Sequence, residues 1–390
     1  MSRKRSIIIF VSVMIILTSL GCYYLEERIV WAWPFLEKFK NYIFITLGLY
    51  VFMQVLGPIS YRISPLSKQR PFILQWLTYI SMGFFASLFF YFLVAEIMVF
   101  VIFKAAHLFM QSPDVFKLET LELHFFQGIS VVSVVTALWG MLTALKSPVI
   151  ENVDVEIKNL PTDFKGFKIA QISDLHVGPT ISHRYAEKVV NLVNDLKPDI
   201  IVLTGDIVDG MADQLREQIQ PLKNLKAPMG VYYCTGNHEY YWGGEQWCQE
   251  FQKIGFKVLL NQHQILKKGS SEIALGGIPD IRGGQFVQSH HPDISKTFKG
   301  VSKEMIKILM AHQPSAYKLS LEGGVHLQLS GHTHGGQFFP WSILVALTQK
   351  FYKGLYLHQN LWIYTNRGTG YWGPPQRFSV PPEITLLQLT

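Results

Sequence analysis

The chain of 390 residues is longer than one ordinary domain, so two modules or one large module are expected. Apolar residues make up 49% of it and charged residues 16%, and the mean hydropathy is +0.19, which excludes disorder, coiled coil and collagen. The net charge of +7 is uneven, because residues 1–150 hold 12 Lys and Arg against 7 Asp and Glu, and the remainder holds 23 against 21. Cations that flank apolar runs favour a membrane protein over a nucleic-acid-binding protein.

Four apolar stretches meet the length of about 20 residues that a membrane-crossing helix needs. The first follows a basic N-terminus, as a signal peptide does, but it is long and lacks a small-residue cleavage pattern before Cys22. We therefore interpret it as an anchor and predict an all-α membrane domain at residues 1–150. The four predicted transmembrane helices cover residues 6–25, 41–60, 72–100 and 126–145.

Cations in short loops predict the orientation of the membrane domain. The segments expected in the cytoplasm hold Arg3, Lys4, Arg5, Arg62, Lys68 and Arg70. The contrast is small, since the loop at 26–40 holds three cations as well. An even number of spans returns the chain to its starting side. We therefore expect a multi-pass protein of the cell membrane with residues 151–390 in the cytoplasm.

The third apolar stretch contains a carboxylate, Glu96. An ionisable group within a span is a candidate for proton or ion transfer by default. Glu96 lies near the end of its span, where reaching the interface costs little, so the simpler interpretation is a tilted helix with no transport role.

Residues 151–390 have the pattern of a layered α/β or α+β domain, with short β-rich runs separated by turns and amphipathic segments. Ser182 is placed to cap a helix whose apolar positions share one face, between the first two predicted strands, which predicts a βαβ unit. The predicted strands are 167–172, 199–204, 231–235, 306–311, 325–329, 361–365 and 384–389.

Five short polar groups directly follow predicted strands, where sheets of this kind place their active sites. Each group alone is ordinary turn chemistry or a satisfied histidine. Together they bring carboxylate, amide and imidazole donors, which bind divalent transition metals, to one edge. The groups are Asp174 with His176, Asp206 with Asp209, Asn237 with His238 and Glu239, His312, and His332 with His334.

In this order the groups resemble the calcineurin-like metallophosphoesterase superfamily, and the resemblance covers residues 160–390. The segments 335–337, 366–370, 374–377 and 381–384 are similar to the bacterial phosphodiesterase branch, and the apolar spans are similar to the transmembrane metallophosphoesterases. The resemblance implies that residues 151–390 form a four-layer α/β/β/α sandwich with a dinuclear metal centre and hydrolase activity.

The resemblance also implies the role of each residue. One metal would be held by Asp174, His176, Asp206 and His334, and the other by Asp206, Asn237, His312 and His332. His238 would face the phosphate and act as general acid, and Asp209 would orient it, although a turn carboxylate is the alternative for Asp209. Oxygen and imidazole ligands suit manganese, iron or zinc better than calcium, and manganese is the first choice.

Several residues near these groups allow two interpretations each. Arg367 and Arg377 either contact a phosphate or brace the Pro-rich end of the chain. Tyr240, Tyr241 and Trp242 either line a substrate cleft or pack in the core. The apolar stretch at 338–347, which is too short to span a membrane, is either a buried core helix or an interfacial element that delivers an acyl-bearing substrate.

The preferred function is a membrane-anchored di-metal phosphodiesterase that hydrolyses a lipid-linked or envelope-precursor phosphoester or pyrophosphate through a metal-bridging hydroxide. A UDP-2,3-diacylglucosamine pyrophosphatase-like enzyme is the alternative, although its soluble form carries Gly-Asn-Arg-Asp where residues 236–239 read Gly-Asn-His-Glu. A protein phosphatase is disfavoured, because Asp209 is followed by Gly-Met and not by Arg-Gly. A non-catalytic metal-binding membrane or envelope protein and a transporter with a regulatory domain are alternatives from other classes.

Overall fold

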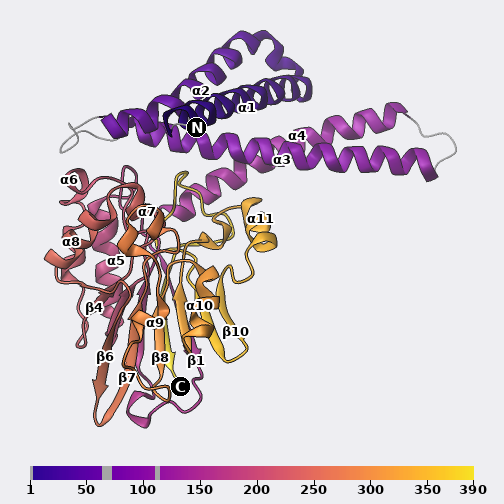
Figure 1. Cartoon of the computed structure of the whole chain (residues 1–390). Coiled ribbons are helices and arrows are strands. Elements are labelled where there is room, and N and C mark those ends of the chain that lie inside the picture. The colour runs from indigo at the N-terminus through magenta and orange to yellow at the C-terminus, as the bar shows by residue number, and fades with distance from the viewer. Residues whose placement is uncertain (1–2, 64–72, 110–114) are drawn as a thin grey trace. The chain divides into compact units, whose positions relative to one another are not determined.

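The computed structural model describes residues 3–63, 73–109 and 115–390 (Figure 1). It divides into two compact units, Met1–Met141 and Leu142–Thr390, and helix α4 carries the chain from one to the other. The first unit is helical. Its helices are α1 (Arg3–Ala32), the 3-10 helix η1 (Pro34–Phe39), α2 (Lys40–Ile63), α3 (Ile73–Phe109) and α4 (Val115–Ala144).

Within the described residues, three helical segments are long and apolar enough to cross a membrane, namely Pro34–Gly57, Ile73–Ala106 and Lys117–Ala144. They overlap the second, third and fourth predicted spans. The first predicted span lies in α1, which is not among the three, so the count of four spans stays a prediction. Lys68 and Arg70, on which the predicted orientation depends, lie outside the described residues.

Glu96 on α3 is paired with a cation from another helix. Arg28 on α1 donates to both carboxylate oxygens of Glu96, at 2.5 and 2.8 Å, and Tyr24 OH donates to the same group at 2.9 Å. Arg28 Nη1 also lies 3.4 Å from Glu122 Oε1 on α4. A bidentate ion pair of this kind offsets the cost of a carboxylate in an apolar helix and ties three helices together.

We expect Glu96→Gln to lower the thermal stability of the chain in detergent. The amide cannot neutralise Arg28, and leaving a hydrogen-bonded group without its charged partner costs about 1–3 kcal/mol. The melting temperature of the purified protein measures the effect, with Glu119→Gln on the exposed face of α4 as the matched control. Equal melting temperatures for the two variants would show that the pair contributes nothing to helix packing.

The second unit contains two six-stranded mixed sheets. The first has the order β1-β12-β2-β3-β4-β5, and the second has the order β10-β11-β9-β8-β7-β6. The first sheet comprises β1 (Val149–Val155), β2 (Lys168–Ile172), β3 (Ile200–Leu203), β4 (Val231–Tyr233), β5 (Lys257–Val258) and β12 (Glu383–Leu389). The second comprises β6 (Gln262–Lys268), β7 (Ser271–Gly277), β8 (Lys307–Met310), β9 (Leu327–Ser330), β10 (Gly354–His358) and β11 (Leu361–Thr365).

Helices cover the outer face of each sheet. Residues of β2, β3 and β4 pack with α5 and α8 in one core, and residues of β7, β8 and β11 pack with α9 and the region of α10 in another. A third core lies between the two sheets. The predicted four-layer sandwich is thus confirmed (Figure 1). The helices of this unit are α5 (His183–Asp195), α6 (Ala212–Leu215), α7 (Asn237–Tyr241), α8 (Gly244–Lys253), α9 (Ile294–Thr297), α10 (Tyr317–Glu322) and α11 (Trp341–Thr348).

The predicted βαβ unit is present as β2, α5 and β3. The two strands pair in parallel, with Ile169 opposite Ile200, and α5 buries Val189 and Val193 against them. Ser182 is the N-cap residue of α5, although its side chain makes no cap hydrogen bond with the described residues. All seven predicted strands exist, whereas β1, β5, β6, β7 and β10 were not predicted.

The carboxyl ends of parallel strands from both sheets meet at one edge of the sandwich. A side chain of the first sheet joins the two ends, because Gln171 Nε2 donates to Thr204 Oγ1 and to the Ser330 carbonyl, at 2.9 Å each. The loops that follow β2, β3, β4, β8 and β9 therefore lie close together. These are the loops that carry the five polar groups.

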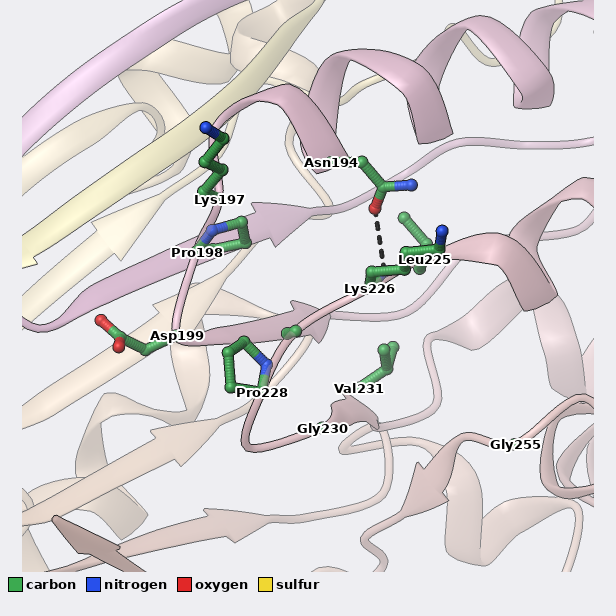
Figure 2. Close-up of a pocket in the computed structure, with 11 residues that line it drawn as sticks. Asn194, Lys197, Pro198, Asp199, Leu225, Lys226, Pro228, Gly230, Val231 and Gly255 are labelled. Atoms are coloured by element: carbon green, nitrogen blue, oxygen red, sulfur yellow. Dashed lines mark hydrogen bonds between the residues drawn. The ribbon is translucent and has the colours of Figure 1, made fainter.

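A pocket of 650 Å³ lies at the opposite edge of the first sheet (Figure 2). It is lined by residues just before β3 and β4, including Lys197, Asp199 and Lys226, and Asn194 Oδ1 accepts a hydrogen bond from Lys226 N at 2.8 Å. Its lining contains neither histidine nor cysteine. The metal-type side chains are thus at the other end of the strands from this pocket.

Candidate metal centre

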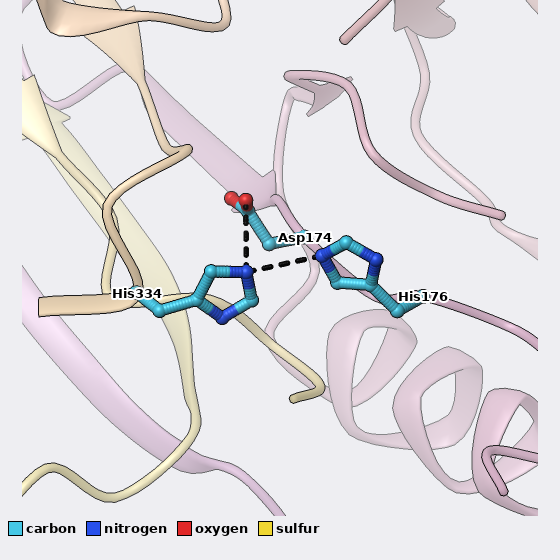
Figure 3. A group of neighbouring side chains, drawn as sticks. All are labelled: Asp174, His176 and His334. Carbon is cyan, nitrogen blue, oxygen red and sulfur yellow. Dashed lines mark hydrogen bonds and ion pairs between the residues drawn. The ribbon is translucent and has the colours of Figure 1, made fainter. Parts of the chain in front are cut away.

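Asp174, His176 and His334 form one group of buried metal-type ligands (Figure 3). The two imidazoles point toward one another, with 3.0 Å between their Nε2 atoms, and His334 Nε2 lies 3.4 Å from Asp174 Oδ1. Asp174 and His176 follow β2 and His334 follows β9, so the group joins the two sheets.

Asp206, His312 and His332 form a second group. His312 Nε2 lies 3.1 Å from Asp206 Oδ2, and His332 Nδ1 lies 3.3 Å from His312 Nε2. Asn237 is 6% exposed, and its Oδ1 atom is buried without a hydrogen-bond partner among the described residues. An amide oxygen left unsatisfied in this way is free to bind a cation.

His238 and Asp209 lie beside both groups. One Asp209 oxygen accepts from His176 Nδ1 at 3.0 Å, and the other makes a short hydrogen bond with His238 Nδ1. His238 N donates to Asp206 Oδ1 at 2.8 Å, and His238 Nε2 lies 3.9 Å from Asp206 Oδ2. The structure therefore brings together all nine residues that the sequence predicted for the site.

The hydrogen bonds of His312 show that its other nitrogen suits a metal. His312 Nδ1 lies 2.8 Å from the Thr204 carbonyl, which only accepts, so Nδ1 must donate. Burial opposes the charged ring, but the Asp206 carboxylate 3.1 Å from Nε2 outweighs it and raises the pKa of His312 well above its ordinary value, so Nε2 carries a proton in the absence of a metal. A divalent cation would take the place of this proton, because two facing acceptors need a positive charge between them. Together with the unsatisfied oxygen of Asn237, this donor set fits divalent cations.

Burial and neighbouring charges fix the ionisation of the ligands. Burial and the His312 charge lower the pKa of His332 to about 3, and burial with Arg377 holds the pKa of His334 well below its ordinary value. Both rings are thus neutral, the form that binds metals. Burial opposes the Asp206 charge, but His312 and His238 outweigh it and hold that pKa well below the usual range.

Five of the candidate ligands have left-handed backbone conformations, which non-glycine residues rarely adopt. Their φ angles lie between 51° and 71°. Loop-to-loop hydrogen bonds hold this geometry, since Asp174 N donates to the Gly205 carbonyl and His176 N to the Asp206 carbonyl, both at 3.0 Å. Strain gathered at one place in this way is typical of functional sites. The five residues are Asp174, His176, Asp206, His332 and His334.

Glu239 has a structural role at the centre that the sequence analysis did not assign. Its fully buried carboxylate accepts from Asp206 N at 3.0 Å, from Ile207 N at 2.7 Å and from Gly236 N at 2.7 Å. It therefore joins the loops after β3 and β4. Burial, followed by the Asp206 charge, raises the pKa of Glu239 to about 7. In the sequence, only its position directly after Asn237 and His238 indicates that Glu239 belongs to the site.

Arg367 and Arg377 brace the end of the chain, which decides between their two interpretations. Arg377 is fully buried and donates to the His334 and Arg367 carbonyls at 3.1 and 2.6 Å, while its Nη2 lies 3.0 Å from His334 Nδ1. Arg367 pairs with Glu383 and, at 2.7 Å, with Glu151. Arg377 thereby holds the ring of a candidate ligand.

Two exposed aromatic side chains contact the ring of His238, and a third contacts one of these two. Its ring centroid lies 5.2 Å from that of Tyr241 and 5.7 Å from that of Trp372, and Tyr241 lies 5.8 Å from Phe286. These three side chains are 41%, 56% and 46% exposed. We call Tyr241, Phe286 and Trp372 the aromatic rim. Tyr240, by contrast, is buried at 5% exposed, and Trp242 is half-buried and packs against the core between the first sheet and its helices.

Gly331→Ala is expected to weaken metal binding at least tenfold. A Cβ at this position would lie 2.0 Å from Ser173 Oγ and 2.1 Å from Asp174 Oδ2, so the Asp174 carboxylate would have to move. Displacing or misorienting ligands typically costs about 10–100-fold in metal affinity. Titration of metal into the stripped protein measures this. Gly128→Ala is the control, because no described atom other than adjacent residues of its own helix lies within 4 Å of its Cβ, and equal affinities would contradict the expectation.

Comparison with known proteins places this site in a family. The calcineurin-like phosphoesterase model matches residues 167–336, a range that contains all nine predicted site residues. The chain is 35% identical over 267 residues to a zebrafish transmembrane protein with metallophosphoesterase domain, covering 66% of this chain. It spans 61% of the length of that relative.

Bacterial relatives are covered more fully. The chain is 36% identical over 272 residues to a metallophosphoesterase of Campylobacter jejuni, covering 69% of this chain and 70% of the relative. It is 34% identical over 261 residues to a metallophosphoesterase of Bacillus subtilis, covering 64% of this chain and 89% of the relative. The chain therefore belongs to the calcineurin-like metallophosphoesterases, a family that depends on two metal ions.

Proposed function

We propose that the chain is a membrane-anchored di-metal phosphodiesterase, with residues 151–390 as its catalytic domain. The observation that carries the proposal is the convergence of two buried ligand groups, with the unsatisfied Asn237 oxygen, beside His238. Asp174, His176, Asp206 and His334 would hold one metal, and Asp206, Asn237, His312 and His332 the other. Manganese is our first choice for both, with iron or zinc as alternatives.

Held by these residues, two divalent cations would supply an activated water and would neutralise charge on the phosphoryl oxygens. The chain's own residues then control the proton. Asp209 accepts from His238 Nδ1, which leaves the Nε2–H of the charged ring free to donate. As water adds to phosphorus and the ester P–O bond breaks, the leaving oxygen takes this proton from His238. His238 and Asp209 are thus the proposed catalytic pair.

We propose a lipid-linked or envelope-precursor phosphoester or pyrophosphate as the substrate. The aromatic rim supports this, because it offers apolar surface to the substrate beside the proposed proton donor. The position of Arg282 supports a substrate that carries a second phosphoryl group, as a pyrophosphate does. It is exposed on the loop after β7, and its charge contributes to lowering the pKa of His332. A planar guanidinium is well suited to phosphate oxygens.

Hydrolysis assays on the full-length chain in detergent test the function. The protein is stripped with a chelator, reloaded with manganese, and given a chromogenic phosphodiester and the matching monoester. We expect diester turnover that needs the metal and is lost in Asp174→Asn, while Asp154→Asn on the exposed edge of β1 retains it. Absence of metal-dependent turnover of both esters would favour the non-catalytic metal-binding alternative.

We also propose that the catalytic unit lies in the cytoplasm. The loop cations and the predicted even number of spans support this. A reporter enzyme fused after Thr390 and active only in the periplasm would overturn it.

A further inference from the structure

Helix α11 exposes an apolar face next to the candidate metal centre. The chain passes from His334 through the buried Phe338 directly into this helix. Every residue of α11, all of which the structure describes, is exposed or half-buried. The core-helix interpretation of the stretch at 338–347 is therefore wrong. We call Trp341, Ile343, Leu344 and Leu347, which are 41%, 49%, 42% and 79% exposed, the α11 face.

The α11 face is held in place by the backbone around the metal loop. Ser342 N donates to the Phe338 carbonyl at 3.0 Å, and Gly336 approaches so closely that a Cβ there would lie 2.2 Å from Ser342 Cα. Thr333 Oγ1, beside His334, donates to the Tyr352 carbonyl at 2.5 Å on the far side of the helix. Both ends of the helix are thus tied to the loop that carries His332 and His334.

An apolar face of this kind needs a partner, because apolar surface left in water costs about 25 cal/mol per Å². Ile343, Leu344 and Leu347 lie at positions that share one side of a helix. Contiguous exposed apolar surface with polar surroundings marks an interaction site. No described residue of the second unit covers the face, so its partner must come from outside this unit.

The charges around α11 identify that molecule. Residues 338–353 contain Lys350 and Lys353 and no Asp or Glu. Both lysines are exposed, and Trp341 stands at the other end of the helix. Tryptophan and lysine around a short apolar helix are the pattern of elements that lie in the headgroup region of a bilayer, where lysine attracts anionic lipids. Three segments of the same chain are long and apolar enough to cross a membrane.

We infer that the α11 face inserts into the headgroup region of a bilayer that contains anionic lipid, next to the metal loop. The contact would place the catalytic site at the membrane surface, where a lipid-linked substrate is presented. This consequence rests on the proposed function, whereas the membrane contact itself does not.

Depth-dependent fluorescence quenching tests the contact on the full chain in nanodiscs of phosphatidylcholine and phosphatidylglycerol. A fluorophore is attached at Leu347→Cys and, as the matched control, at Leu357→Cys on β10, which is 57% exposed. The native cysteines Cys22, Cys234 and Cys248 are buried and are replaced by alanine only if they react. Lipids brominated near the headgroup and aqueous iodide serve as the two quenchers.

We expect the brominated lipid to quench the label at 347 at least twofold more than the label at 357, and iodide to quench it at least twofold less. Equal quenching at the two positions would overturn the inference. Shielding of the label at 347 from both quenchers would overturn it as well, because a protein surface or a second copy would then cover α11. The readout involves no catalysis, so it separates failure of this inference from failure of the proposed function.

Discussion

Asp206→Asn is expected to remove most of the bound metal and to lower turnover by about 10²–10⁴-fold. Asp206 is 2% exposed and its pKa lies well below the usual range, so it supplies a permanent negative charge between His312 and His238. The amide keeps the shape and loses that charge. Leaving buried positive charge without its partner costs about 3–5 kcal/mol, which corresponds to this range of rates.

Metal content and rate are measured together on this variant. Elemental analysis after dialysis should give two metals per chain for the parent and fewer than one for Asp206→Asn. Asp199→Asn is the matched control, because the Asp199 carboxylate lies at the other edge of the sheet. It accepts a hydrogen bond from Lys168 N at 2.7 Å. Full metal content in Asp206→Asn would show that this carboxylate does not bridge two cations.

The position of the candidate site follows from the sequence because the strands that precede it are strongly patterned. The strands β2, β3, β4, β8 and β9 are short runs whose every residue is half-buried or buried, and a polar motif closely follows each of them. The carboxyl ends of parallel strands meet at one edge, so five separate motifs converge. The sequence does not predict β6 in this way, because β6 is an edge strand whose exposed polar residues are typical of a loop.

Contacts between distant residues could not be predicted in the same way. Arg28 and Glu96 lie 68 positions apart, and nothing in either local sequence names the other as its partner. Arg377 was an equally good candidate for phosphate binding until burial excluded it. Glu239 resembles a surface carboxylate in a turn, and only the fold shows that it accepts from three backbone N–H groups. Such pairings depend on helix and loop packing, which local patterns do not encode.

His238→Gln is expected to have an effect that depends on the leaving group. If His238 protonates the leaving oxygen, an alkyl phosphodiester, whose alkoxide leaves poorly, should lose about 10²–10⁴-fold in rate. A p-nitrophenyl ester, whose phenolate leaves without a proton, should lose much less. Steady-state rates on the two esters measure the ratio, and equal losses on both would mean that His238 stabilises charge without transferring a proton.

The pH dependence of Asp209→Asn gives an independent result for the same pair. Burial opposes the charged ring of His238, but Asp209 and then Asp206 outweigh it and raise the pKa of His238 to about 10. Without the Asp209 charge, this pKa should fall toward the ordinary value of about 6.5. An acid must be protonated to act, so the alkaline limb of the kcat profile should move to lower pH by at least one unit. Asp213→Asn on the exposed end of α6 should leave the profile in place. An unchanged alkaline limb in Asp209→Asn would mean that another group causes that limb. The role of Asp209 would then be to orient His176, whose Nδ1 it also accepts from.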